Sequence, residues 1–192
     1  MPQSGFTPNP ETKPTGGRGG WGPDLVVDLF AQRVYRFLVA MIRDRDAAED
    51  LTQDTFLKIQ GTRNRFGDGP PPVSYVLTVA RNTAISWLRR RRFEQHHFRA
   101  LPDASPQALA STRAGNDPAR ELHRKELQAD LQAALAALPV ELREVFLLSE
   151  VEGLTYAEIA AVAMCATGTV ASRKHNAVRQ LRNLLRRQGH AV

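Results

Sequence analysis

The chain of 192 residues carries a formal net charge of +6, because 26 lysine and arginine residues outnumber 20 aspartate and glutamate residues. That length allows one ordinary domain or two small ones, and the single cysteine excludes an intrachain disulfide and fits a reducing cytosol. No grouping of cysteine and histidine has the spacing of a zinc site, and we expect neither a metal nor a cofactor. The positive charge favours a polyanionic partner.

Residues 1–23 form a lead of low apolar content. Their sequence, MPQSGFTPNPETKPTGGRGGWGP, is rich in glycine and proline and lacks an apolar core. It therefore matches neither a secretory signal peptide nor a membrane-spanning segment. We predict that this lead is disordered and that the chain does not insert directly into a membrane.

A helical repeat of apolar residues begins at Asp24, which is placed to cap the N-terminus of the first helix. The predicted apolar face of this helix consists of Leu25, Leu29, Val34, Phe37, Leu38 and Met41. A second helix is predicted for residues 46–60, and its buried face consists of Ala48, Leu51, Thr55 and Ile59.

The second helix carries further apolar side chains away from that face. Phe56 and Leu57 lie there with Gln53, within residues 44–58, where five acids outnumber two bases. Exposed apolar side chains among carboxylates indicate a protein interface. The alternative is a second buried face against a neighbouring helix.

A loop rich in helix breakers follows at residues 61–73, GTRNRFGDGPPPV, and its three consecutive prolines make it stiff. We predict a third helix at residues 74–92, with an outward face of Arg81, Asn82, Ile85, Arg89 and Arg92. An amide between guanidinium groups, with Trp87 and Phe93 nearby, could follow a phosphate backbone and engage an unstacked base. The alternative is an ordinary basic helix end, although four consecutive arginines exceed what capping requires.

Residues 94–119 hold scattered proline, glycine, serine and alanine with weak periodicity, which indicates a flexible linker between two domains. After it, Leu127, Leu131, Leu135 and Leu138 follow helical spacing until Pro139 ends the helix. Another helix ends by Gly153. Because the alternating pattern of β-strands is absent, we predict an all-α fold of two small helical domains.

The last part of the chain predicts a helix-turn-helix motif in the second domain. Thr155 and Glu158 have the spacing of a capping box for a short helix. A turn at residues 164–166 leads to Thr167, which is expected to cap a longer helix. A helical wheel places Val170, Ala177, Leu181 and Leu184 inward and Ala171, Ser172, His175, Asn176, Arg179 and Arg182 outward.

The outward arc of the longer helix carries hydroxyl, imidazole, amide and guanidinium groups. Such groups can meet base edges and phosphates in a DNA major groove. Residues 164–192 also contain six lysine and arginine residues and no acid. This charge favours DNA binding, while a solvated basic helix remains the alternative.

Four segments, in order, resemble motifs of bacterial RNA polymerase sigma factors of the extracytoplasmic-function (ECF) group. They are DAAEDLTQDTFLKI from Asp46, YVLTVARNTAISWLRRRR from Tyr75, LPVELREVFLLSEVEGLTYAEIAAVA from Leu138 and TGTVASR from Thr167. The resemblance implies a non-enzymatic, cytoplasmic alternative sigma factor, with sigma domain 2 at residues 24–93 and sigma domain 4 at residues 120–192. Such a protein binds core polymerase, recognises minus-thirty-five and minus-ten promoter elements and helps to melt the latter, commonly in a stress response.

The resemblance also implies residue roles and partners. The surface for core polymerase would consist of Asp50, Gln53, Asp54, Phe56 and Leu57. The minus-ten element would meet Phe66, Asp68, Arg81, Asn82, Arg89, Arg90, Arg91 and Arg92. The minus-thirty-five element would meet Thr167, Thr169, Ala171, Ser172, Arg173, His175, Asn176 and Arg179. The implied partners are the β′ clamp and β flap of core polymerase, promoter DNA and a separate anti-sigma factor, with no small-molecule substrate.

Several positions depart from the family pattern. Tyr75 and Ser86 stand where the family usually has tryptophan and an acid, and Ala171, Asn176 and Val178 stand where it often has arginine or lysine. We therefore predict that the last helix makes fewer cationic contacts with DNA than the last helix of such family members does. Two other functions stay open, namely a stand-alone helix-turn-helix regulator and a sigma-like module that binds only protein.

Overall fold

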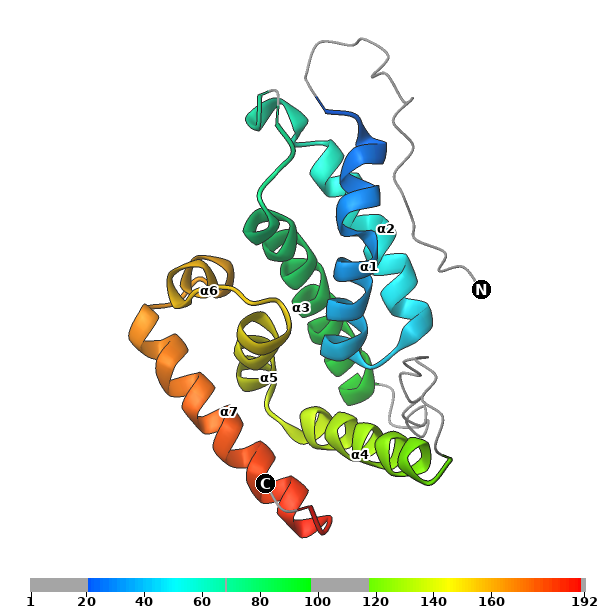
Figure 1. Cartoon of the computed structure of the whole chain (residues 1–192). Helices are drawn as coiled ribbons and strands as arrows, with labels where there is room; N and C mark the ends of the chain where they lie inside the picture. Colours follow the sequence, from blue (N-terminus) through cyan, green and yellow to red (C-terminus); the bar gives the residue numbers. More distant parts are fainter. Residues whose placement is uncertain (1–20, 68, 98–117, 191–192) are drawn as a thin grey trace.

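The computed structural model describes residues 21–67, 69–97 and 118–190, and every regular element within these ranges is helical. The first group contains α1 (Pro23–Ile42), α2 (Arg45–Gln60) and α3 (Val73–His97). The second group contains α4 (Pro118–Ala137), α5 (Val140–Phe146), α6 (Tyr156–Ala163) and α7 (Thr167–Arg187). The two groups lie side by side (Figure 1), and the all-α prediction is confirmed.

A tight turn joins α1 to α2. Arg43 ends α1 in the left-handed conformation (φ 63°), and its backbone N–H donates to the Val39 carbonyl. Asp44 then begins α2, because its side chain accepts a hydrogen bond of 3.0 Å from the Ala47 backbone N–H. The predicted buried face of α2 is confirmed for Ala48, Leu51, Thr55 and Ile59.

Two details of the prediction for α1 are wrong. Gly22 occupies the capping position, and Pro23 occupies the first helical position. Proline suits that position because a backbone N–H there would have no partner within the helix. Asp24 therefore lies inside the first turn. Leu25 and Leu29 are exposed, whereas Val26 is buried. The first turns thus rotate the apolar stripe by about one residue, which the helical period alone does not determine.

The described residues reach into the ranges predicted as lead and linker. Trp21 is buried although it lies in the range 1–23, and the Arg63 guanidinium lies 5.7 Å from its ring centroid. At the linker, α3 continues to His97 and α4 begins at Pro118, so both helices enter the range 94–119. The remainder of the predicted lead and linker, residues 1–20 and 98–117, lies outside the described residues.

The second group contains the predicted helix-turn-helix, formed by α6 and α7. Thr155 and Glu158 make a complete capping box, in which each side chain accepts a hydrogen bond from the other residue's backbone N–H. Thr167 is not a cap, because Ala166 has the extended backbone of the capping position and Thr167 is already helical. The inward positions Val170, Ala177 and Leu181 are buried as predicted.

Three leucines of the second group are less buried than their helical spacing indicates. On α7, Leu185 is buried and the predicted Leu184 is only half-buried. On α4, Leu127 and Leu131 are exposed, while the smaller Ala134 is buried against α7 with Leu138. A small residue allows the two helix backbones to approach, which a search for large apolar residues overlooks.

The two groups share one hydrophobic core, although the sequence predicts them only as domains joined by a linker. Val145, Leu148 and Ile159 of the second group belong to the same cluster of buried side chains as Phe37 and Leu77 of the first. Helix α3 packs against α6, and α1 contacts α4 and α5. In Figure 1, α5 and α6 accordingly lie beside α3.

Arg143 of α5 binds the C-terminal ends of two helices, α1 and α4, in this contact. Its guanidinium donates to the carbonyl of Met41 at 2.6 Å, near the end of α1. It also donates to the carbonyls of Leu135 at 2.9 Å, Ala136 at 2.7 Å and Leu138 at 3.0 Å, at the end of α4. A cation is favoured at helix C-termini, where carbonyls lack partners. Burial, and secondarily the charge of Arg43, lowers the pKa of Arg143 to about 10, so it stays charged at neutral pH.

We predict that Arg143→Met lowers the free energy of unfolding by about 3 kcal/mol, because the buried carbonyls lose their donor while the side-chain volume is nearly kept. The control is Arg182→Met on the exposed face of α7, which should change stability by less than about 0.5 kcal/mol. Urea unfolding followed by circular dichroism measures both changes. Equal losses in the two variants would contradict the role of Arg143.

Candidate protein and nucleic-acid interfaces

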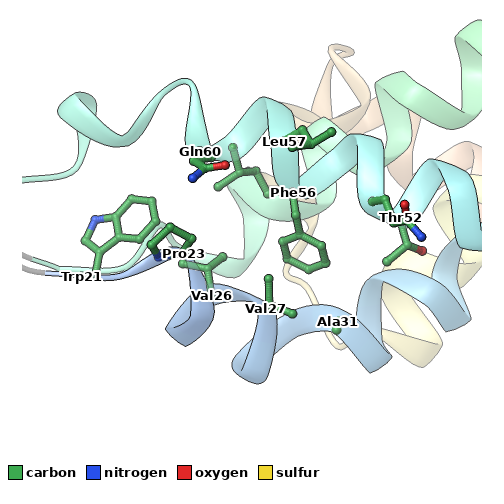
Figure 2. A pocket seen from close by; sticks show the side chains of 11 residues that line it. Trp21, Pro23, Val26, Val27, Ala31, Thr52, Phe56, Leu57 and Gln60 are labelled. Atoms are coloured by element: carbon green, nitrogen blue, oxygen red, sulfur yellow. The ribbon is translucent and has the colours of Figure 1, made fainter. Parts of the chain in front are cut away.

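An open apolar groove lies between α1 and α2. Its cavity has a volume of about 370 Å³, and Figure 2 shows its two walls. Val26, Val27 and Ala31 line it from α1, and Gln53, Phe56 and Leu57 line it from α2. Leu57 is 65% exposed, whereas Ile59, which also lines the groove, is 1% exposed. Leu57 therefore does not belong to a second buried face.

The groove collects three of the five residues predicted for core polymerase. Gln53, Phe56 and Leu57 line it, and Asp50 and Asp54 are exposed on the same helix. Phe56 is half-buried and packs against the core, so its position is fixed by the fold. The α1 wall was not predicted from the sequence, and its residue Val27 is exposed. The sequence held a signal for this wall, because the start of α1 is rich in apolar residues. Those of its apolar repeat, Leu25 and Leu29, were however assigned to the core.

The loop before α3 is held by a short chain of polar contacts. The Tyr75 hydroxyl donates to the Thr62 hydroxyl oxygen at 2.9 Å, and the Thr62 hydroxyl donates to the Ile59 carbonyl at 2.8 Å. The rings of Phe66 and Tyr75 meet edge to face, with centroids 4.6 Å apart. The Phe66 ring is therefore half-buried, and its contact with Tyr75 holds it in place in the loop. Asp68, also predicted to meet DNA, lies outside the described residues.

The arginines of α3 fall into two sets. Arg81 is tied to the second group, because its Nε lies 2.8 Å from Oε1 of Glu144, and the two side chains are only 14% and 1% exposed. Arg91 pairs with Asp44 at 3.0 Å and lies over the Trp87 ring, 4.9 Å from the centroid. The remaining predicted residues of this surface are exposed, namely Asn82, Arg89, Arg90 and Arg92.

Asn82 and Glu144 both contact Arg81. Nη1 of Arg81 donates a hydrogen bond of 3.1 Å to the Asn82 side-chain oxygen, and Nη2 donates to Oε2 of Glu144 at 3.5 Å. Burial of Glu144 raises its pKa above the ordinary value, although the hydrogen bond and the charge of Arg81 oppose this effect. Sequence reasoning did not pair these residues, because they stand 63 positions apart.

All the residues predicted to meet the minus-thirty-five element lie on one basic helix, α7. Thr167, Ala171, Ser172, His175 and Arg179 are exposed, and Thr169, Arg173 and Asn176 are half-buried. The side-chain oxygen of Asn176 accepts a hydrogen bond of 3.0 Å from Nη2 of Arg179. This contact holds the amide on the outward face, beside the guanidinium.

An ion pair joins α7 to the segment that precedes α6. Lys174 lies 2.8 Å from Glu150 and 5.4 Å from the Tyr156 ring centroid. The hydrogen bond between them raises the pKa of Lys174 and lowers the pKa of Glu150. Met164 occupies the turn between α6 and α7 in the left-handed conformation and is exposed.

In the described part of the chain, no cluster of three or more histidine, cysteine, aspartate or glutamate side chains is arranged to hold a metal ion. Among the helices that the structure describes, none combines the length and the apolar character required to cross a membrane.

Comparison with known protein families gives two matches. Residues 26–94 match the model "Sigma-70 region 2", and residues 128–181 match the model "Sigma-70, region 4". The first match covers α1 to α3 except their outermost residues, and the second extends from α4 into α7.

Several curated proteins are similar over most of the chain. The ECF RNA polymerase sigma factor SigE of Mycolicibacterium smegmatis is 35% identical over 84% of this chain and 61% of its own length. The RNA polymerase sigma factor CarQ of Myxococcus xanthus is 34% identical over 84% of this chain and 90% of its own length. The ECF sigma factor SigC of Mycobacterium tuberculosis is 34% identical over 74% of this chain and 71% of its own length.

Two solved structures share the fold. The sigma factor RpoE in complex with the anti-sigma factor NepR, from Bartonella quintana, superposes with a TM-score of 0.70 and 28% identity, covering 85% of this chain and 96% of that one. CnrH in complex with the cytosolic domain of CnrY superposes with a TM-score of 0.59 and 18% identity, covering 85% and 86% of the two chains. The second likeness shows the fold alone.

Proposed function

This chain belongs to the ECF sigma factors of bacterial RNA polymerase, which direct promoter-specific transcription, and from this membership we propose how its surfaces share that function. The groove between α1 and α2 binds core polymerase. Helix α3 and the loop before it bind the minus-ten element, and α7 binds the minus-thirty-five element. The observation that carries the proposal is an uncovered apolar groove on the same chain as two basic helical surfaces.

The groove suits the clamp helices of the β′ subunit. An amphipathic helix can place its apolar side chains against Val27, Phe56 and Leu57, while cations on its flanks meet Asp50 and Asp54. The groove is already formed in the free chain, so little ordering opposes docking. The β flap is proposed to contact the second group.

The minus-ten surface combines a base-binding group with phosphate-binding groups. Asn82 is exposed beside Arg81 and offers an amide that can hydrogen-bond an unstacked base. Arg89, Arg90 and Arg92 follow on the exposed face and can neutralise phosphates of the melted strand. Phe66 lies on the supported loop before α3, where its ring edge can meet a base.

The minus-thirty-five surface reads duplex DNA through α7. Its exposed side chains supply donors and acceptors for base edges, and its Arg173 and Arg179 supply cations for phosphates. Ala171 adds no charge to this face. We therefore propose that DNA binding by α7 depends more on shape and on Asn176 than DNA binding by a more cationic helix does.

The remaining assignments follow from the same proposal. The chain acts in the cytoplasm, performs no chemical step of its own and requires no cofactor. A separate anti-sigma protein restrains it, which is supported by the similarity to RpoE, a sigma factor solved in complex with an anti-sigma factor. That partner would cover surfaces that polymerase also needs.

The direct test is reconstituted transcription with purified core RNA polymerase and genomic DNA fragments. The chain should convert core polymerase into an enzyme that initiates at discrete promoters. The free chain should bind the same duplex promoters weakly, because polymerase holds two DNA-binding surfaces at a fixed separation. Tight and sequence-selective binding by the free chain, with no gain for polymerase, would support a stand-alone regulator instead.

We predict that Leu57→Asp abolishes core-polymerase binding while the chain stays folded. The substitution places a charge in the centre of an apolar contact, where loss often costs about 2 kcal/mol or more. Leu127→Asp is the control, because it makes the same change at an exposed leucine of α4, outside the groove. Binding is measured by fluorescence anisotropy and folding by circular dichroism. If both variants bind equally well, the groove is not the docking site.

We predict that Asn82→Ala slows promoter opening on duplex DNA and is partly rescued on a template already unpaired at the minus-ten element. The reason is that the amide acts on a base only after that base leaves the stack. Asn183→Ala, an exposed asparagine of α7, serves as the control. Open complexes are measured by permanganate reactivity. An equal defect on both templates would contradict a base-binding role for Asn82.

We predict that Asn176→Arg shifts the preferred base at one minus-thirty-five position from adenine toward guanine, by about 1 to 3 kcal/mol. Asparagine pairs with adenine N6 and N7, whereas arginine pairs with guanine O6 and N7. Ala171→Arg should instead raise affinity across sequences and steepen its salt dependence. Selection from randomised minus-thirty-five sequences with the holoenzyme measures both changes. An unchanged selected sequence for Asn176→Arg would place that side chain away from the bases.

A further inference from the structure

Trp21 is a large buried side chain that lies just before α1. It is 2% exposed and belongs to the same cluster of buried side chains as Val26 of α1 and Ile59 of α2. The match to the Sigma-70 region 2 model begins only at residue 26. Trp21 therefore lies outside the matched residues, although it lines the groove between α1 and α2.

Helices α1 and α2 form a hairpin that the chain connects at one end only. They pack against each other, and the turn at Arg43 and Asp44 joins the end of α1 to the start of α2. At the opposite end, which we call the open end, the start of α1 and the end of α2 have no direct connection along the chain. Helix ends open easily unless other contacts hold them. The width of the groove at the open end therefore depends on side-chain contacts.

The start of α1 also lacks the capping that begins α2. Asp44 caps α2 with a side-chain hydrogen bond to the Ala47 backbone N–H. Gly22, at the capping position of α1, has no side chain that could accept such a bond. The first turn of α1 is therefore held mainly by its tertiary contacts.

Trp21 makes such contacts at the open end. The groove-lining residues nearest to it in the chain or across the hairpin come from the start of α1 and the end of α2, namely Pro23, Val26, Ile59 and Gln60. Figure 2 shows Trp21 and Gln60 toward one end of the groove, with Ala31 and Thr52 toward the other. The indole therefore lies where the two helices are not joined by a turn.

The segment after α2 contacts the same ring. Arg63 follows the end of α2, and its guanidinium lies 5.7 Å from the centroid of the Trp21 ring. A cation over an indole face is favourable, and burial of an aromatic ring of this size contributes strongly to packing. Trp21 thus connects the segment before α1 with the segment after α2.

We propose that Trp21 holds the start of α1 against the end of α2 and thereby sets the width of the groove in which core polymerase docks. This inference rests on the proposed function of the groove. It makes Trp21 a positioning residue, because the indole is buried and acts through the exposed side chain of Val27 on the α1 wall.

The role of Trp21 is tested first by the affinity of the full-length chain for core polymerase, measured by fluorescence anisotropy. Trp21→Ala should weaken binding at least about tenfold, because docking must then also order the first turns of α1. Trp21→Phe should stay within about threefold of wild type, because a phenyl ring keeps the apolar burial and the contact with Arg63. Among the described residues, Nε1 of Trp21 has no hydrogen-bond partner, so this replacement breaks no bond there.

The matched control is Leu77→Ala, which removes a fully buried side chain of α3 from the same cluster but away from the groove. It should bind core polymerase like wild type at a temperature where circular dichroism shows that every variant is folded. If Trp21→Ala does not fold, Trp21→Leu replaces it in all measurements, because leucine keeps an apolar side chain without the ring.

The second measurement is the distance between spin labels in the free chain. Labels on cysteines at the exposed positions Asp24 and Asn64 report on the open end of the hairpin. Labels at the exposed positions Arg36 and Asp46 report on the end with the turn. Both pairs are introduced in a Cys165→Ala background. Electron–electron resonance then gives the distribution of distances for each pair.

Trp21→Ala should broaden the distribution at the open end and leave the end with the turn unchanged, whereas Leu77→Ala should change neither. Broadening without weaker binding, or equal loss of binding in Trp21→Ala and Leu77→Ala, would overturn the positioning role. Wild-type binding by Trp21→Ala would overturn it as well, and the groove would still stand if Leu57→Asp abolishes binding. If Leu57→Asp also binds like wild type, the proposed function of the groove fails first.

Discussion

The arrangement of the molecule depends on three charged side chains buried at one contact. Arg143, Glu144 and Glu152 of the second group face the first, where Arg143 donates to the Met41 carbonyl and the two carboxylates pair with Arg81 and Arg33. Burying a charge without such partners is costly, so these contacts strongly disfavour other orientations of the two groups. They position α5 and α6 on α3 and thereby determine which surfaces remain exposed.

This arrangement exposes the proposed functional surfaces unequally. The groove of α1 and α2 and the outward face of α7 are open, whereas the proposed minus-ten surface has one of its arginines bound to Glu144.

The residues that were predictable from sequence are those with local signals. The buried face of α2 follows from its helical period, and the capping box at Thr155 follows from the spacing of two residues. Periodicity did not specify helix rotation to within one residue, which is why Leu25 and Leu29 were assigned to the core and Leu184 was chosen over Leu185. The ion pair of Arg81 with Glu144 has no local signal, because its members are brought together only by tertiary packing.

The account is tested most directly by hydrogen–deuterium exchange of the full chain, free and bound to core polymerase. Amides of α2 on the groove should exchange more slowly in the complex, because polymerase covers them. No change in α2 would contradict docking at the groove.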